Sequence, residues 1–191
     1  MKYVFQKNEW FMEGLVHAGS VRFPSMPEFA QRDNYIENQE TPASKDGYAY
    51  ISLVTKEKLQ PGVQISTHCA FENRAAPLIV LPKKLIEKDG NLFYEDYLEV
   101  VLWKHGINVW NLWMGEDGTV QIRNLLRLEQ PVEAGVIHDL SVKIKRDSFV
   151  ITLDGSRVAL YCDAIYDSFH LGITGCEGPC RFYDMTIEEN K

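Results

Sequence analysis

One stretch of the chain combines aromatic and polar residues in a pattern suited to binding a sugar. It reads LEVVLWKHGINVWNLWM, from Leu98 to Met114, and contains three tryptophans among aliphatic residues. A pyranose ring stacks its apolar C–H face on an indole, while its hydroxyl groups need planar polar partners such as carboxylates and amides. The stretch offers both kinds of group. The chemical question is whether the indoles face a ligand or the core.

A strand–turn–strand reading of this stretch separates its residues into two faces. A turn at His105-Gly106 predicts an antiparallel hairpin, in which side chains alternate between the faces. One face is mostly aliphatic and is assigned to the core; it carries Leu98, Val100, Leu102, Val109, Asn111 and Trp113. The other face is assigned to an open sheet surface; it carries Glu99, Val101, Trp103, Asn108, Trp110 and Leu112. A slip of one residue would exchange the faces.

Polar residues of two further segments extend the candidate site. In TVQIRN, Gln121 and Arg123 alternate with apolar neighbours, and in GVQISTHCAF, Gln64 and His68 lie on the polar side. The sequence therefore predicts a binding site that contains Glu99, Trp103, Asn108, Trp110, Arg123 and His68. The alternative is that both tryptophans pack beneath a loop and bind nothing.

The sequence assigns no catalytic residue. Glu99 is the acidic residue that can be placed centrally, and a role as hydrogen-bond acceptor is favoured over a role as nucleophile. A glycosidase needs a second carboxyl group, about 5 to 5.5 Å away in a retaining enzyme, and no partner is identifiable. The chain has no P-loop, no Rossmann glycine pattern and no G-x-S-x-G, so no cofactor is expected.

Composition narrows the class of partner. The chain has 191 residues and a formal net charge of −7. Its densest basic stretch is VKIKRD, which is too short for a phosphate-binding stripe, so a nucleic-acid partner is not expected. No apolar run reaches the roughly 18 residues that span a bilayer, so no membrane partner is expected. The N-terminal segment lacks the apolar core of a signal peptide, and we expect a cytoplasmic location.

The four cysteines predict no metal site. Cys69 and Cys162 lie in apolar surroundings, as small buried hydrophobes do. Cys176 and Cys180 form CEGPC, and one such spacing without a second ligand pair is weak support for zinc. We expect two free thiols there, with a disulfide as the alternative in an oxidising compartment.

The remaining pattern predicts an all-β protein. GVQISTHCAF and LSVKIKR alternate with period two, and SFVITLDGSRVALY is a hairpin on an Asp154-Gly155 turn. Helical signals are weak: Pro82 to Gly90 is expected to form one or two turns, and Glu28 to Gln31 one short turn. The rest of Pro24 to Gly47 is expected to be irregular. Trp10 is expected to close one end of the core. Many short strands indicate a sandwich or a barrel.

The C-terminal third carries a resemblance to a known fold family. HDLSVKIKRDSFVITLDGSRVALY is followed by FHLGITGCEGPCRFYDMTIEE, which resembles the closing strands of concanavalin A-like jelly rolls, including laminin-G-like and bacterial sugar-hydrolase-like domains. The resemblance covers Gly47 to Glu189 in pattern and is specific over Asp139 to Glu188. It implies one domain over residues 1–191, with two curved antiparallel sheets, a last strand beside the first, and a concave sheet that commonly holds a glycan.

Two motifs of that family are not matched. Laminarinase-type members carry Glu-x-Asp-x-x-Glu on a strand, whereas YEDYLEV places Glu95, Asp96 and Glu99 at a different spacing. The metal-binding Asp and Asn loop of legume lectins has no counterpart in EKDGNLFYED. The function expected is therefore that of a carbohydrate-binding, lectin-like sandwich with an oligosaccharide on its concave sheet. The alternatives are a glycoside hydrolase or lyase of the same fold, or an intracellular protein-interaction sandwich.

Overall fold

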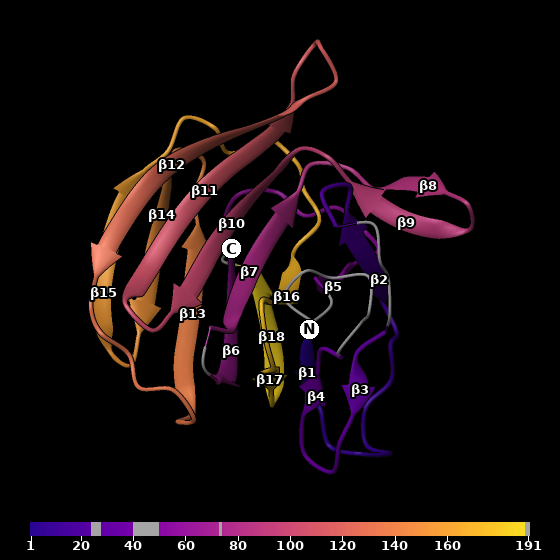
Figure 1. Cartoon of the computed structure of the whole chain (residues 1–191), viewed down its shortest axis with the longest axis vertical. Helices are drawn as coiled ribbons and strands as arrows, with labels where there is room; N and C mark the ends of the chain where they lie inside the picture. The colour runs from indigo at the N-terminus through magenta and orange to yellow at the C-terminus, as the bar shows by residue number, and fades with distance from the viewer. Residues whose placement is uncertain (24–27, 40–49, 73, 190–191) are drawn as a thin grey trace.

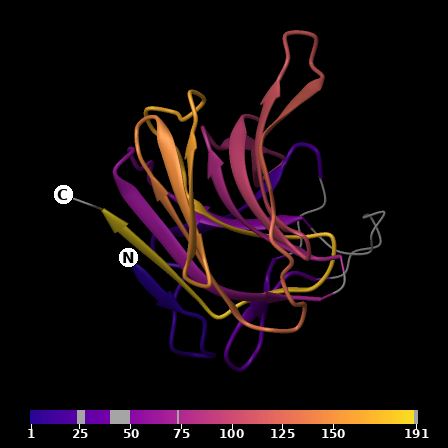
Figure 2. The same ribbon diagram turned by 90° about the vertical axis from the view of Figure 1, so that its left-hand side faces the viewer.

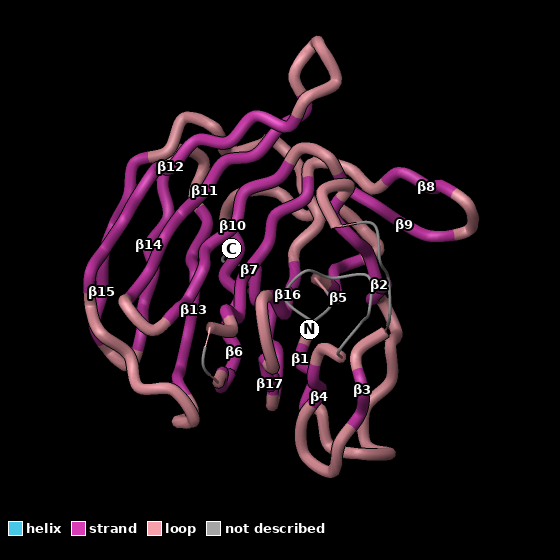
Figure 3. Tube along the Cα trace, viewed as in Figure 1, coloured by secondary structure: helices cyan, strands magenta, loops and turns pink. Residues whose placement is uncertain are grey.

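The computed structural model shows two stacked β-sheets (Figures 1 and 2). It describes residues 1–23, 28–39, 50–72 and 74–189. Within these ranges every regular element is a strand and none is a helix (Figure 3). Accordingly, the described residues contain no helix able to cross a membrane. The prediction of an all-β, two-sheet antiparallel sandwich is confirmed.

Sheet A is formed mainly by the C-terminal half of the chain together with its N-terminal end. Its strands follow the order β15 (Ser156–Tyr161), β14 (Ser148–Leu153), β13 (His138–Ile144), β6 (Val63–Phe71), β17 (Cys180–Phe182), β4 (Ile36–Glu37) and β3 (Ala30–Gln31). A further pair, β18 (Asp184–Glu189) and β1 (Lys2–Val4), joins this sheet because β18 pairs with both β6 and β1.

Sheet B is the second layer. Its strands follow the order β12 (Val120–Glu129), β11 (Gly106–Met114), β10 (Tyr97–Trp103), β7 (Ala76–Pro82), β16 (Gly172–Cys176), β5 (Ile51–Thr55), β2 (Leu15–Ser20), β9 (Asn91–Tyr94) and β8 (Ile86–Lys88). The contact between β2 and β9 is parallel, while the other described pairings of this sheet are antiparallel.

The two ends of the chain meet in sheet A, as the fold resemblance implies. The last strand, β18, pairs antiparallel with the first, β1, so that Lys2 lies opposite Thr186 and Val4 opposite Asp184. Strand β1, in indigo, and strand β18, in yellow, lie on the same side of the sandwich (Figure 2).

Period-two alternation builds the core between the sheets. On β6, the residues predicted to face inward are Val63, Ile65, Thr67, Cys69 and Phe71, and all five are buried. From sheet B, Leu98, Val100 and Leu102 of β10 join the same apolar cluster. Burying an aliphatic side chain of this size contributes roughly 1.5–3 kcal/mol, so this alternation is a main source of stability.

Turn chemistry fixes the C-terminal hairpin of sheet A. β14 and β15 are joined at Asp154-Gly155, where both residues have positive φ angles, 48° and 81°. Two successive residues with positive φ are what a type I′ turn requires, and its twist matches that of the strands. The prediction of a hairpin at this dipeptide is confirmed.

The β10–β11 hairpin has the predicted faces but a different register. Trp103 lies opposite Gly106 and Glu99 opposite Trp110, so the turn residues are Lys104 and His105, not His105 and Gly106. Gly106 begins β11 with φ of 131°, and a Cβ there would lie 2.1 Å from the Leu128 carbonyl oxygen. Because the register differs by two residues, each side chain keeps its face.

Both helical predictions are wrong. In the first segment, β8 pairs with β9 across Asp89 and Gly90, whose φ angles are 52° and 76°. This Asp-Gly turn signal outweighs the weak helical pattern before it. In the second segment, β3 pairs with β4. Residues 24–27 and 40–47 of the stretch expected to be irregular lie outside the described residues.

Trp113 is half-buried, which corrects its assignment to the core. On one side, Trp113 pairs with Gln121 of β12. On the other side it has no partner in β10, because the first residue of β10, Tyr97, lies opposite Leu112. Trp113 therefore lies beyond the end of β10, where β11 and β12 continue as a two-stranded arm above the sandwich (Figure 1). An arm without a third strand beside it cannot seal an indole.

Candidate functional site

A pocket of about 410 Å³ lies on the outer face of sheet B. Four of the six residues predicted for the site line it: Glu99, Trp103, Asn108 and Trp110. The other lining residues are Arg22, Phe23, Tyr50, Arg74, Ala76, Leu78, Val101, Ile122, Cys176 and Glu177. Its volume is in the range typical of small-ligand pockets.

Strand alternation places the predicted residues on this face. Glu99 and Trp103 project from β10 on the side opposite the core, and Asn108 and Trp110 do so from β11. Glu99 lies directly opposite Trp110. Both tryptophans are half-buried and pack on a second apolar cluster, on the outer face of sheet B, that includes Leu78. The indoles are therefore not sealed between the two sheets.

Glu99 forms the polar centre of the pocket. It is 7% exposed, and the hydroxyl of Tyr50 donates a hydrogen bond of 2.9 Å to its Oε2. Burial raises the pKa of Glu99 to about 7, and Glu177 also raises it, against the hydrogen bond from Tyr50 and the charge of Arg22, which lower it. Near neutral pH the carboxyl group is thus present in both its ionised and its neutral form.

Buried hydroxyl groups support the floor of the pocket. Ser52 exchanges hydrogen bonds of 2.7 Å with both the Tyr94 hydroxyl and the Thr174 hydroxyl. The Tyr97 hydroxyl lies 3.0 Å from the hydroxyl of Ser20. Burial raises the pKa of Tyr97 to about 12 and moves that of Tyr94 in the same direction, so both phenols stay neutral. Satisfied polar groups of this kind fix the strands that carry the site.

The rim of the pocket comes from segments far apart in the sequence. Phe23 stacks on Tyr50 with ring centroids 4.8 Å apart, and the Arg22 guanidinium lies 5.1 Å from the centre of the Phe23 ring. Arg74 and Glu177 line the pocket from the β6–β7 and β16–β17 connections. Sequence reasoning missed these residues because they lie in connections, where no periodicity shows which way a side chain points.

Asn108 brings an unsatisfied polar atom to the pocket. Its Oδ1 is buried and has no hydrogen-bond partner within the described part of the chain. Buried polar atoms are almost always paired, so an unpaired acceptor in a pocket is a natural partner for a ligand hydroxyl. Asn111 Oδ1 is also unpaired among the described residues, but it belongs to the opposite face of β11.

Arg123 and His68 are not brought to the pocket. A β-bulge interrupts the β11–β12 pairing, and Ile122 takes the pocket face of β12 while Arg123 alternates away from it. Beyond the bulge, the guanidinium of Arg127 lies 6.0 Å from the centre of the Trp103 ring. His68 lies on sheet A, where its Nδ1 is 2.6 Å from Asp184 Oδ2.

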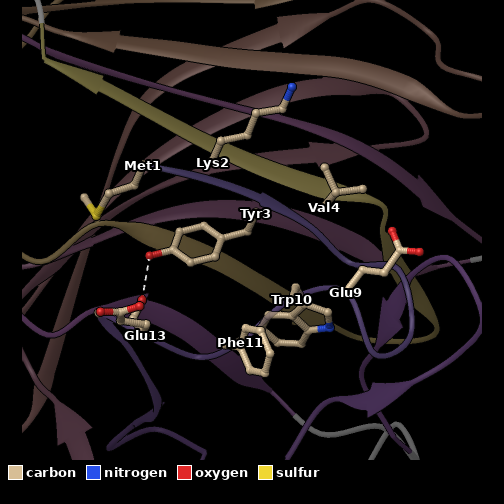
Figure 4. Close-up of a pocket in the computed structure, with 9 residues that line it drawn as sticks. Met1, Lys2, Tyr3, Val4, Glu9, Trp10, Phe11 and Glu13 are labelled. Carbon is tan, nitrogen blue, oxygen red and sulfur yellow. Dashed lines mark hydrogen bonds between the residues drawn. The ribbon is translucent and has the colours of Figure 1, made fainter.

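A second hollow, of about 500 Å³, lies beside β1 (Figure 4). Two of its polar groups are engaged within the protein: the Tyr3 hydroxyl donates a hydrogen bond of 2.8 Å to the Glu13 carbonyl, and the Trp10 indole N–H donates to Gln31. Trp10 packs edge-on against Phe5, with ring centroids 4.8 Å apart, and is a partly buried neighbour of the main core cluster. No predicted site residue lines this hollow, and we place the candidate site on sheet B.

The cysteines add no metal centre. The described residues contain no group of three or more His, Cys, Asp or Glu side chains arranged to hold a metal ion. All four cysteines are free and buried, and Cys176 lines the pocket. Burial raises the pKa of the Cys180 thiol to about 12 and raises that of Cys176 as well. These thiols are protonated at neutral pH and chemically inert.

Comparison with solved structures places the fold among the concanavalin A-like jelly rolls. A carbohydrate-binding module from Bacillus subtilis is 12% identical, with a TM-score of 0.56 over 86% of this chain and 99% of that one. A β-agarase in complex with oligoagarose is 9% identical, with a TM-score of 0.59 over 97% and 82%. A structure reported with endo-acting O-glycanases of the human gut microbiota is 7% identical, with a TM-score of 0.65 over 100% and 99%.

At these identities the likeness shows the fold alone, and carbohydrate-binding and glycan-cleaving neighbours have similar weight. No protein-family model matches the sequence, and no match was found among curated proteins.

Proposed function

We propose that the protein binds an oligosaccharide in the sheet B pocket. The observation that supports this most directly is the pairing of two half-buried indoles, Trp103 and Trp110, with the polar groups of Glu99 and Asn108 in one hollow. A sugar needs both an apolar platform and planar hydrogen-bonding groups, and pockets that combine them are typical of small-ligand sites. The neighbours in fold include one protein named as a carbohydrate-binding module.

Each side chain has a distinct role in this proposal. Trp103 and Trp110 stack on pyranose faces. Glu99, held by the Tyr50 hydroxyl at 2.9 Å, and the unpaired Oδ1 of Asn108 bind sugar hydroxyl groups. These polar groups come from strands or are tied to them. The site is therefore largely formed before the ligand arrives, which reduces the entropic cost of binding.

Replacing one indole tests the proposal. Trp103→Ala is expected to abolish retention on a glycan array, while its thermal midpoint stays within a few degrees of the wild-type value, because the ring is half-buried. Trp113→Ala is the matched control, since this half-buried indole lies on the two-stranded arm outside the pocket. Unchanged retention in Trp103→Ala, or a large fall in its midpoint, would refute the assignment.

A glycoside hydrolase is the second candidate, and Glu99 is the observation that favours it. A buried carboxyl with its pKa raised to about 7 has the character of a general acid, and Glu177 lines the same pocket. Glu99→Gln separates the two functions. A hydrolase would lose the release of reducing sugar from its substrate, whereas a binding protein would release none before or after the substitution.

A further inference from the structure

The cations of the pocket come from two separate connections. Arg22 follows β2, and Arg74 lies between β6 and β7, and both line the hollow in a chain whose net charge is −7. Arginine presents planar N–H groups that match a carboxylate or a sulfate in two parallel hydrogen bonds. A neutral sugar has no group that requires two guanidinium groups.

The charge balance of the pocket depends on Glu99. Among the described residues, the other titratable groups that line the pocket are Arg22, Arg74, Glu177, Tyr50 and Cys176, and the buried phenols of Tyr94 and Tyr97 lie in the apolar cluster beneath it. Burial raises the pKa of the phenols and of the thiol, so they are neutral. The described lining therefore holds two arginines and two carboxyl groups. When Glu99 is protonated, these described groups carry one surplus positive charge, which an anionic ligand would neutralise.

Building on the proposed function, we propose that the saccharide carries an anionic group, a carboxylate or a sulfate, which Arg22 and Arg74 hold beside Glu99 in the sheet B pocket. The neutral acid group of Glu99 then donates a hydrogen bond to the ligand and does not repel it. Arg127 is left out of the charge balance of the pocket, because it does not line the pocket and its guanidinium pairs with the Glu129 carboxylate at 3.5 Å.

Protonation of Glu99 on binding distinguishes an anionic sugar from a neutral one. An anion bound beside Glu99 favours the protonated form, so binding takes up a proton wherever free Glu99 is ionised. Free Glu99 has a pKa of about 7. The affinity is therefore constant below about that pH and falls by up to about tenfold per pH unit above it.

The experiment compares matched sugars by isothermal titration calorimetry at pH 6 to 8.5. One pair is an oligogalacturonate and its methyl ester, and the other is a carrageenan oligosaccharide and its desulfated form. The anionic member of at least one pair is expected to bind about tenfold tighter than its neutral partner. The pair that shows the preference identifies the anion as carboxylate or sulfate. Titration in two buffers of different ionisation enthalpy should reveal the proton taken up.

Variants assign the effect to residues. Arg22→Gln and Arg74→Gln are each expected to lower the anionic preference about tenfold, and both side chains are exposed, so unchanged thermal midpoints should confirm folding. Glu99→Gln should remove the pH dependence. Arg123→Gln, a cation outside the pocket, is the control and should change nothing. Equal binding of both members of each pair, or binding of neutral glycans alone, overturns this inference and leaves the proposed function standing. Absence of binding to any glycan overturns both.

Discussion

Ionisation of Glu99 should make the protein less stable as pH rises toward neutral. The pKa of this carboxyl is about 7 in the folded protein and 4.5 in a solvated chain, mainly because of burial. Between these values the folded protein holds a proton that the unfolded chain has lost, so the unfolding free energy falls with increasing pH. At about 1.4 kcal/mol per pKa unit, the loss is on the order of 3 kcal/mol above pH 7.

Glu99→Gln tests this reasoning because an amide of the same shape cannot ionise. Urea unfolding of both proteins at pH 5, 6, 7 and 8 should show the variant gaining stability relative to the wild type as pH rises. The gain should level off above pH 7 at roughly 3 kcal/mol. Tyr50→Phe removes the hydrogen bond that lowers the pKa of Glu99, so its transition should lie at higher pH. If the unfolding free energies of the wild type and Glu99→Gln differed by the same amount at all four pH values, the raised pKa of Glu99 would be refuted.

Three further outcomes are expected. Gly172→Ala should cost about 3 kcal/mol or more in urea unfolding, because a Cβ would lie 1.9 Å from the Leu53 carbonyl oxygen on the neighbouring strand; stability near that of the wild type would contradict this packing. His68→Ala should leave glycan retention unchanged within about twofold, since sheet A holds this residue outside the pocket, and loss of retention would point to a second site. The four buried thiols should react with a colourless disulfide reagent only after unfolding, and rapid labelling of the native protein would contradict their burial.

Much of the fold could be predicted because alternation is robust to errors of register. The predicted turn in the β10–β11 hairpin was displaced, yet Glu99, Trp103, Asn108 and Trp110 reached the predicted face. A side-chain period of two makes any even displacement harmless. The hairpin at Asp154-Gly155 was predictable for a different reason: the dipeptide itself supplies the required backbone angles.

The remaining errors have local physical causes. Arg123 was placed on the wrong face because the polar side of TVQIRN was taken as the side of the pocket. Arg123 pairs with Asn111 and Ile122 with Leu112, so the apolar Ile122 takes the pocket face of β12. His68 was assigned correctly to the polar side of its strand, but the sequence did not tell which sheet that strand joins. Tyr50 and Arg22, which lower the pKa of Glu99 against the effect of its burial, lie just outside strands. No pattern there links them to Glu99, which is 49 or more positions away in the sequence.

The two carboxyl groups found among the described lining residues of the pocket are held in different ways, one by a strand and the other by a turn. The pocket side of β10 presents Glu99 and Trp103 with Val101 between them, so this strand supplies one carboxylate. Among the described residues that line the pocket, the second carboxyl group is that of Glu177, which lies in the β16–β17 turn with a positive φ of 58°. Two carboxyl groups on paired strands would be held at a fixed separation by the sheet. Here the position of the second carboxyl group depends on the backbone conformation of the turn. Sequence changes in that turn can therefore alter the charge of the pocket without disturbing the sheet strands that carry Glu99, Trp103 and Trp110.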